Sequence, residues 1–192
     1  TNSAALAAQA VAEVALLSDP NPAFGIPSVR AGVDTTLTYD VLVDMGAVPG
    51  TGFDGLRIAT SAVSEFVKLE MGPDLAEVTP DSVREETTEL LIYFPSNRIT
   101  EGREERLRVT FRSRLFVFST EFSGQLLDTR GSLPQALAEG DASADVGSNS
   151  LRMVFDRAGE HLVQGFEIVP RVITPNGDGV NDEAAFTFAL IH

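Results

Sequence analysis

The residues with the clearest chemistry lie near the carboxyl end, in the run Thr174-Pro-Asn-Gly-Asp-Gly-Val-Asn-Asp-Glu183. Asn176, Asp178 and Asp182 have the spacing Asx-x-Asp-Gly-x-x-Asp, which is typical of calcium loops. Calcium takes roughly six to eight oxygen ligands, and backbone carbonyls are among them. The sequence therefore predicts calcium as the one candidate cofactor, with the ligands Asn176, Asp178, Val180 (through its carbonyl), Asp182 and Glu183.

The same run is also compatible with a turn that holds no metal. Gly177 and Gly179 permit the positive φ values of a tight loop. Asn and Asp side chains in such a loop often accept hydrogen bonds from nearby backbone amides. The distal glutamate that closes an EF-hand is missing, so both interpretations stay open at this stage.

A family resemblance appears in this run and in the residues around it. Pro175-Asn-Gly-Asp-Gly-Val-Asn-Asp182 follows a Val-Ile pair and precedes Ala185-Phe-Thr-Phe-Ala-Leu190. It resembles the opening of bacterial immunoglobulin-like modules of the gliding-motility-associated, type IX secretion sorting and flagellar hook-capping-like kinds. The resemblance covers residues 170–192 and implies an extracellular or cell-surface protein exported with a cleaved signal. It implies no catalytic residues, and the later strands of such a module are not present here.

Other catalytic chemistry is scarce. The sequence has no cysteine, no Gly-x-Ser-x-Gly elbow and no phosphate-binding glycine loop, and His161 and His192 are its only histidines. Carboxylates are abundant, but tryptophan is absent and Tyr39 and Tyr93 are the only tyrosines, which leaves few platforms for sugar rings. We therefore predict that the protein is not an enzyme, with no catalytic and no cofactor-binding residues beyond the calcium ligands.

Charge and hydropathy exclude further classes. The formal net charge of −14 is unsuited to a phosphate backbone, so no nucleic-acid partner is expected. No stretch approaches the roughly 20 apolar residues of a membrane-spanning helix. Lys68 is the only lysine beside thirteen arginines, and arginine forms planar, bidentate pairs with carboxylates.

The elements that must position these residues are predicted to be strands. Leu37, Tyr39, Val41 and Val43 alternate with polar residues, and Leu107, Val109 and Phe111 do so between arginines. Further strands are expected around these apolar positions: 56–58, 67–71, 90–94, 115–122, 151–155 and 166–169. Because no long helical patterns alternate with them, we predict an all-β, antiparallel β-sandwich of immunoglobulin-like type. The arginines of 106–114 are expected on its outside, opposite Glu85, Glu86 and Glu89.

Three segments are predicted: an N-terminal arm and proline-rich linker (1–27), the sandwich (28–169) and an incomplete immunoglobulin-like start (170–192). Thr1–Leu17 suits a helix or a strand, and Ala8-Gln9-Ala10 also resembles the end of a signal peptide. The arm is expected either to dock on its own domain or to pair with a neighbouring subunit. Residues 133–139 are a candidate helix.

The long connection from Asp128 to Asn149 is the other candidate for function. Loops of this length are usually functional or mobile. Its acids suggest a cation site or, more simply, a solvated acidic loop.

These features predict a structural or adhesive module, a subunit of an extracellular filament or similar assembly that is joined by strand exchange. Its expected partners are other copies of itself or cell-surface proteins and glycans. The alternative is an accessory domain of a larger secreted protein that binds carbohydrate or protein through the 128–149 loop.

Overall fold

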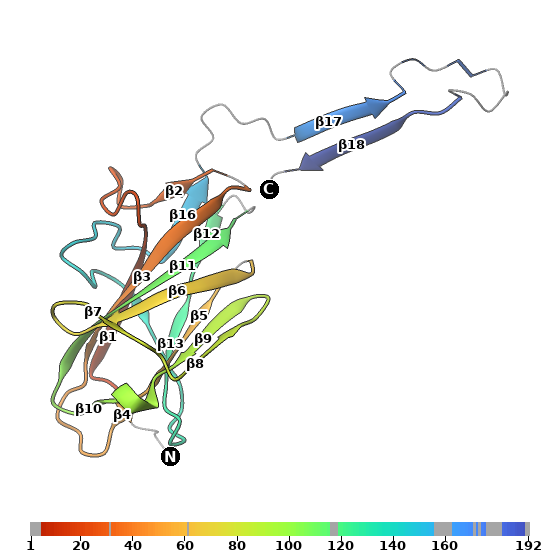
Figure 1. The fold of residues 1–192 in the computed structure, drawn as a ribbon. Helices are drawn as coiled ribbons and strands as arrows, with labels where there is room; N and C mark the ends of the chain where they lie inside the picture. The colour runs from red at the N-terminus through yellow and green to blue at the C-terminus, as the bar shows by residue number, and fades with distance from the viewer. Residues whose placement is uncertain are drawn as a thin grey trace.

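A computed structural model describes residues 5–30, 32–60, 62–115, 119–155, 163–170, 172, 174–175 and 182–190. Within these ranges the secondary structure consists of strands and one short 3-10 helix, η1 (Pro95–Asn97). The fold is an all-β sandwich of mainly antiparallel strands, which confirms the predicted antiparallel β-sandwich (Figure 1). None of the described segments is a helix with the length and apolar character needed to cross a membrane.

The first layer of the sandwich is a six-stranded sheet with the order β15-β1-β3-β11-β6-β7. All neighbours in it are antiparallel except β1 and β15, which run parallel. Its strands are β15 (Ala138–Glu139), β1 (Gln9–Leu16), β3 (Asp34–Asp44), β11 (Glu104–Arg114), β6 (Ser64–Met71) and β7 (Ala76–Val78).

The second layer contains a five-stranded and a three-stranded sheet, with the orders β14-β13-β5-β9-β8 and β12-β16-β2. The first consists of β14 (Gln135–Ala136), β13 (Gly124–Leu127), β5 (Gly55–Ala59), β9 (Glu89–Tyr93) and β8 (Ser82–Glu85). The second consists of β12 (Ser119–Glu121), β16 (Arg152–Phe155) and β2 (Ser28–Val29), and a separate pair joins β10 (Ile99–Thr100) to β4 (Gly52–Phe53).

Alternating side chains explain why these strands form two layers. Leu37, Tyr39, Val41 and Val43 of β3 are fully buried, as the sequence pattern predicts. They belong to one continuous core cluster with residues of the second layer such as Leu56, Ile58, Leu90 and Ile92. Edge-to-face aromatic pairs add to this core, with ring centroids 6.0 Å apart for Phe53 and Phe94 and 5.8 Å apart for Phe111 and Phe122.

One close approach across the core requires a glycine. A Cβ atom at Gly124 of β13 would collide with the hydroxyl of Tyr39 and would lie 2.7 Å from Cδ1 of Leu137. The Tyr39 hydroxyl itself is buried and has no hydrogen-bond partner among the described residues. Burial accordingly raises the pKa of Tyr39.

This geometry makes Tyr39→Phe an informative substitution. Removing a buried hydroxyl that bonds to nothing is expected to leave the free energy of unfolding unchanged or to raise it by about 1 kcal/mol. Urea unfolding of the variant beside the wild type measures the difference. A loss of stability well beyond that size would show that the hydroxyl has a partner.

The N-terminal segment is a strand of the sandwich. β1 pairs with β3 along its whole length, from Gln9 opposite Asp44 to Leu16 opposite Leu37, and its other edge pairs with β15. The choice between helix and strand is thus decided for Gln9–Leu16. Of the two expectations for the arm, docking on its own domain is confirmed for these residues, because Ala12, Val14 and Ala15 are completely buried within the chain's own first sheet. The predicted boundary between arm and sandwich is wrong here, since β1 is itself a strand of the sandwich.

The C-terminal hairpin is separate from the sandwich sheets. β17 (Val163–Val169) and β18 (Ala185–Leu190) form a two-stranded antiparallel sheet of their own. Figure 1 shows this hairpin extending away from the end of the sandwich. β17, which the sequence analysis counted within the sandwich, pairs only with β18 among the described residues.

The arginines of β11 pair with other acids than predicted. Arg112 and Arg114 form exposed ion pairs with Glu65 and Asp34, each at 2.7 Å. Glu89 instead pairs with Arg57, and Glu85 accepts a hydrogen bond from the Phe66 amide at 2.8 Å. The strand order places β6 and β3, not β8 or β9, beside β11.

Candidate functional site

The long connection after β13 is built into the sandwich. Two short strands within it, β14 and β15, pair with β13 and β1. Ala142, Ser143, Val146 and Ser148 are buried. The interpretation as a solvated acidic loop holds for its acids, because Glu139, Asp141 and Asp145 are exposed, but it is wrong for the buried residues between and after them. The candidate helix at 133–139 is replaced by β14 and β15.

A single buried carboxylate holds the distal part of this loop. Glu13 of β1 is completely buried, and its Oε1 accepts hydrogen bonds from the amides of Ala142 (3.0 Å) and Ser143 (2.8 Å). Its Oε2 accepts from the Ser148 hydroxyl (3.1 Å) and the Asn149 amide (2.9 Å). Both oxygens are thus fully used in closing the loop over the outer face of the first sheet.

Charged residues of the neighbouring strands continue this cluster. Asp40 lies opposite Glu13 in the pairing of β1 with β3, and its Oδ1 accepts a 2.7 Å hydrogen bond from Nε of Arg108. Arg106 donates to the Ser143 hydroxyl at 2.8 Å and pairs with Asp145 at 3.3 Å. The acids and arginines in this region therefore form ion pairs and hydrogen bonds with one another and with the loop.

Asp40 gives the cluster a titratable group near neutrality. Burial raises the pKa of this carboxyl to about 6; Arg108 lowers it and Glu13 raises it further. Because the folded-state pKa lies above the usual value of 3.8, the folded protein takes up this proton before the unfolded chain does. The resulting stabilisation is fully present below about pH 3.8 and is lost as the pH rises through 6.

We therefore expect the protein to gain stability from Asp40 when the pH falls from 7 to 5, with an upper limit of about 3 kcal/mol for the complete titration. Urea unfolding at pH 7, 6 and 5 measures this gain. Asp40→Asn is the control, because the amide cannot titrate and should remove the Asp40 component. If the free energy of unfolding changed with pH in the same way in the wild type and in Asp40→Asn, the titrating group would not be Asp40.

A second buried charge fixes the proximal end of the same loop. The Arg98 side chain is only 8% exposed, and its Nη1 donates to Asp54 (2.8 Å) and Asp128 (2.6 Å). Asp54 also accepts from the amide and hydroxyl of Thr129, at 2.8 and 2.7 Å. Burial would raise the pKa of Asp128, but hydrogen bonds from Arg98, Ser132 and the Arg130 amide outweigh it and hold the pKa at about 2.

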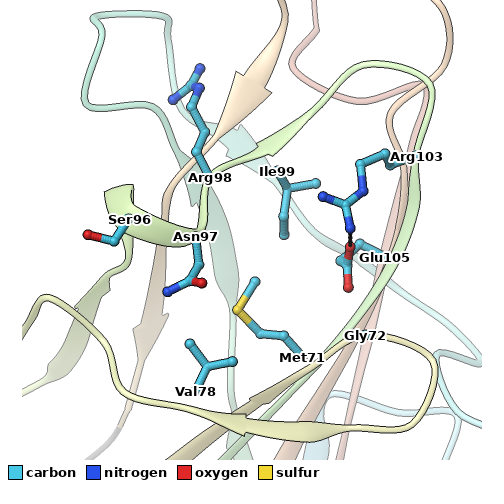
Figure 2. A pocket seen from close by; sticks show the side chains of 9 residues that line it. All are labelled: Met71, Gly72, Val78, Ser96, Asn97, Arg98, Ile99, Arg103 and Glu105. Carbon is cyan, nitrogen blue, oxygen red and sulfur yellow. Dashed lines mark ion pairs between the residues drawn. The ribbon is translucent and has the colours of Figure 1, made fainter.

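A depression of about 420 Å³ lies near this arginine, at one end of the sandwich. Figure 2 shows Met71, Val78 and Ile99 beside the ion pair of Arg103 and Glu105, with the Arg98 guanidinium turned away. Arg103 and Glu105 are 3.1 Å apart, and the Ser96 hydroxyl donates to Asp81 at 2.6 Å. The lining therefore combines apolar side chains with charged ones.

The predicted calcium ligands are only partly described. Asn176, Asp178 and Val180 lie outside the described residues, whereas Asp182 is half-buried and Glu183 is exposed. Where residues are described, no group of three or more acids or histidines is arranged to hold a metal ion. Calcium binding at these five residues stays a prediction.

The comparisons with known proteins find only distant structural likeness. No known protein family matches the sequence, and no curated protein matches it. Among solved structures, the chain resembles the pilus backbone protein RrgB of Streptococcus pneumoniae at 9% identity and a TM-score of 0.41, over 62% of this chain and 32% of that one. The chain thus spans about a third of the length of that structure.

Two further solved structures are similar over more of their own length. One is an uncharacterized protein from Nocardia farcinica with an immunoglobulin-like fold (10% identity, TM-score 0.37, 79% of this chain and 99% of that one). The other is a cohesin module from a Clostridium perfringens glycoside hydrolase (9% identity, TM-score 0.34, 77% and 97%). At these scores the likenesses carry no argument about function, which has to come from the geometry of this chain.

Sequence reasoning missed the two charges that organise the long loop. Glu13 is the only ionised residue of Thr1–Leu17, and a lone acid in an apolar strand signals a buried, partnered group. Arg98 follows the Pro95-Ser-Asn turn and carries no comparable signal, because its two acidic partners are 44 and 30 residues away in the sequence.

Proposed function

We propose that this chain is a non-catalytic structural or adhesive module of the cell surface or of an extracellular assembly. Its partners would be other copies of itself or cell-surface proteins and glycans, joined through β-strand pairing. The proposal rests on a strand edge and apolar side chains that the described residues leave exposed.

The observation that carries the proposal is the C-terminal hairpin. Isolated two-stranded hairpins are marginally stable in water, and three or more strands with an apolar face are usually needed. Yet β17 and β18 pair only with each other among the described residues, and Phe186 and Phe188 are 60% and 48% exposed. A hairpin of this kind is suited to completing a sheet together with another β-structure.

The strand-exchange hypothesis changes in one respect. The N-terminal arm does not support it, because β1 pairs with β3 along its whole length and with β15 at Val11 and Ala12, all within its own chain. The C-terminal strand β18 remains as the element for joining.

Protease treatment of intact source cells tests the proposed location. Peptides from the exposed parts of the sandwich are expected in the supernatant before lysis, together with those of known surface proteins. A cytoplasmic protein serves as the lysis control. Release of these peptides only after the cells are broken would contradict a surface role.

The depression near Arg103 and Glu105 favours the alternative, an accessory domain that binds carbohydrate or protein. Polar groups over an apolar floor are typical of small-ligand contact sites. A glycan array probed with the full chain distinguishes the two functions. Binding that disappears in Glu105→Gln would support the accessory domain over the structural module.

A further inference from the structure

The edges of the sandwich and the edge of the hairpin are protected very differently. In the sandwich, the strands at the sheet edges are short: β15, β14 and β2 have two residues each, β12 and β7 have three, and β8 has four. β8 also carries Arg84 and Glu85. Short and charged edges are the devices by which β-proteins prevent pairing with other chains.

β17 is protected by the same devices. It carries Glu167, and its pairing with β18 contains a register shift between Gln164 and Glu167 that leaves an extra residue in β17. Pro170 follows its last residue directly. Bulges, charges and prolines each disfavour the addition of another strand.

β18 has none of these devices. Its six residues, Ala185-Phe-Thr-Phe-Ala-Leu190, include no charge and no proline, and the register shift lies in the opposite strand. Its side chains from Ala185 to Phe188 are exposed. Among the described strands that end a sheet, β18 is the longest without a charge, so it is the edge best suited to accept another strand.

We propose that β18 pairs antiparallel with β18 of a second copy of this chain, giving a four-stranded sheet β17-β18-β18-β17 across a twofold axis. This inference rests on the proposed function and names its partner. When two copies of β18 pair, the backbone N–H and C=O groups on both open edges find hydrogen-bond partners. A contact across a twofold axis uses the same surface on both copies and is therefore self-complementary. Four strands also exceed the number needed for a stable sheet.

The charge and side-chain pattern support a second copy as the occupant. Although the whole chain has a net charge of −14, strand β18 has no ionised side chain, so identical edges do not repel each other directly. The register must also keep Phe186 and Phe188 on one face, because a slip of one residue moves every side chain to the other face. Two registers of equal length do so, and the one that gives two Phe186–Phe188 pairs across the contact places Thr187 opposite Thr187 of the second copy. Aromatic cross-strand pairs favour this register.

Cysteine cross-linking tests this register in the full chain, which has no cysteine of its own. Opposite residues in an antiparallel pair have Cα atoms about 4.5–5.5 Å apart, within the range that a disulfide requires. Thr187→Cys is therefore expected to form a disulfide-linked dimer under mild oxidation. The matched control is Ala185→Cys on the same face of the same edge, whose two copies would be about 13 Å apart and should not cross-link.

Charge at the same position gives a second, independent measurement. Like charges directly opposite destabilise strand pairing, so Thr187→Lys should weaken dimerisation in sedimentation velocity by up to about fivefold. An equimolar mixture with Thr187→Glu should restore the dimer. Equal cross-linking of both cysteine variants, a wild type that stays monomeric, or a Thr187→Lys protein that associates like the wild type would each overturn the β18 contact. Surface exposure on intact cells would be unaffected by these outcomes, so the proposed function can fail or stand separately.

Discussion

Replacing Arg98 with methionine is expected to lower the free energy of unfolding by about 3–5 kcal/mol, because the change leaves buried carboxylates without their cation. Asp54 and Asp128 are nearly inaccessible, and the Arg98 Nη1 atom is within 2.8 Å of both. Thr129 and Ser132 would keep their hydrogen bonds to these acids but supply no positive charge. Urea unfolding followed by far-UV circular dichroism measures the loss.

Two companion variants make the Arg98 result specific. Arg114→Met removes an arginine whose pair with Asp34 is exposed, so a change below about 1 kcal/mol is expected. The triple variant Arg98→Met, Asp54→Asn and Asp128→Asn removes the charges together and should recover part of the stability. An Arg98→Met protein as stable as Arg114→Met would mean that the buried pairs contribute nothing.

Glu13→Gln is expected to cost about 3 kcal/mol, the second-largest effect. The carboxylate accepts four hydrogen bonds, three of them from backbone amides of the overlying loop. A glutamine has one acceptor oxygen, and its NH2 group would face donors that are then buried and unsatisfied. The same unfolding experiment gives the size of the effect.

Glu65→Gln is the matched control for Glu13→Gln. Glu65 is an acid in the same sheet, but its side chain is 58% exposed and pairs with an exposed arginine. Its replacement should change stability by less than about 1 kcal/mol. Equal, small losses in both variants would show that Glu13 does not hold the loop.

Much of the sandwich could be predicted from local patterns. In 37–43 and 107–111 apolar and polar residues alternate along the sequence. Successive side chains of a strand point to opposite faces, so this alternation shows which side chains face the core. Gln9–Leu16 stayed ambiguous because both of its faces are buried, one against the core and one beneath the 141–149 loop. A segment buried on both faces shows no periodicity to read.

The candidate sites were less accessible to sequence reasoning. The hydrogen bonds of Glu13 join residues 129–136 positions apart, and no local pattern specifies which loop covers which strand. The partners of the β11 arginines depend on strand order in the same way. The exposed edge of β18, in contrast, follows from composition once its pairing is known, because the absence of charge in Ala185–Leu190 is visible in the sequence.

Hydrogen exchange of the full chain at several protein concentrations tests the central claim most directly: that the long loop belongs to the scaffold and that β18 makes the contact between molecules. We predict that the amides of Ala142, Ser143 and Asn149 are protected at every concentration, like those of β3 and β11. The β18 amides that point away from β17 should become protected only as the concentration rises. Rapid exchange in the loop, together with β18 exchange that is independent of concentration, would contradict the account.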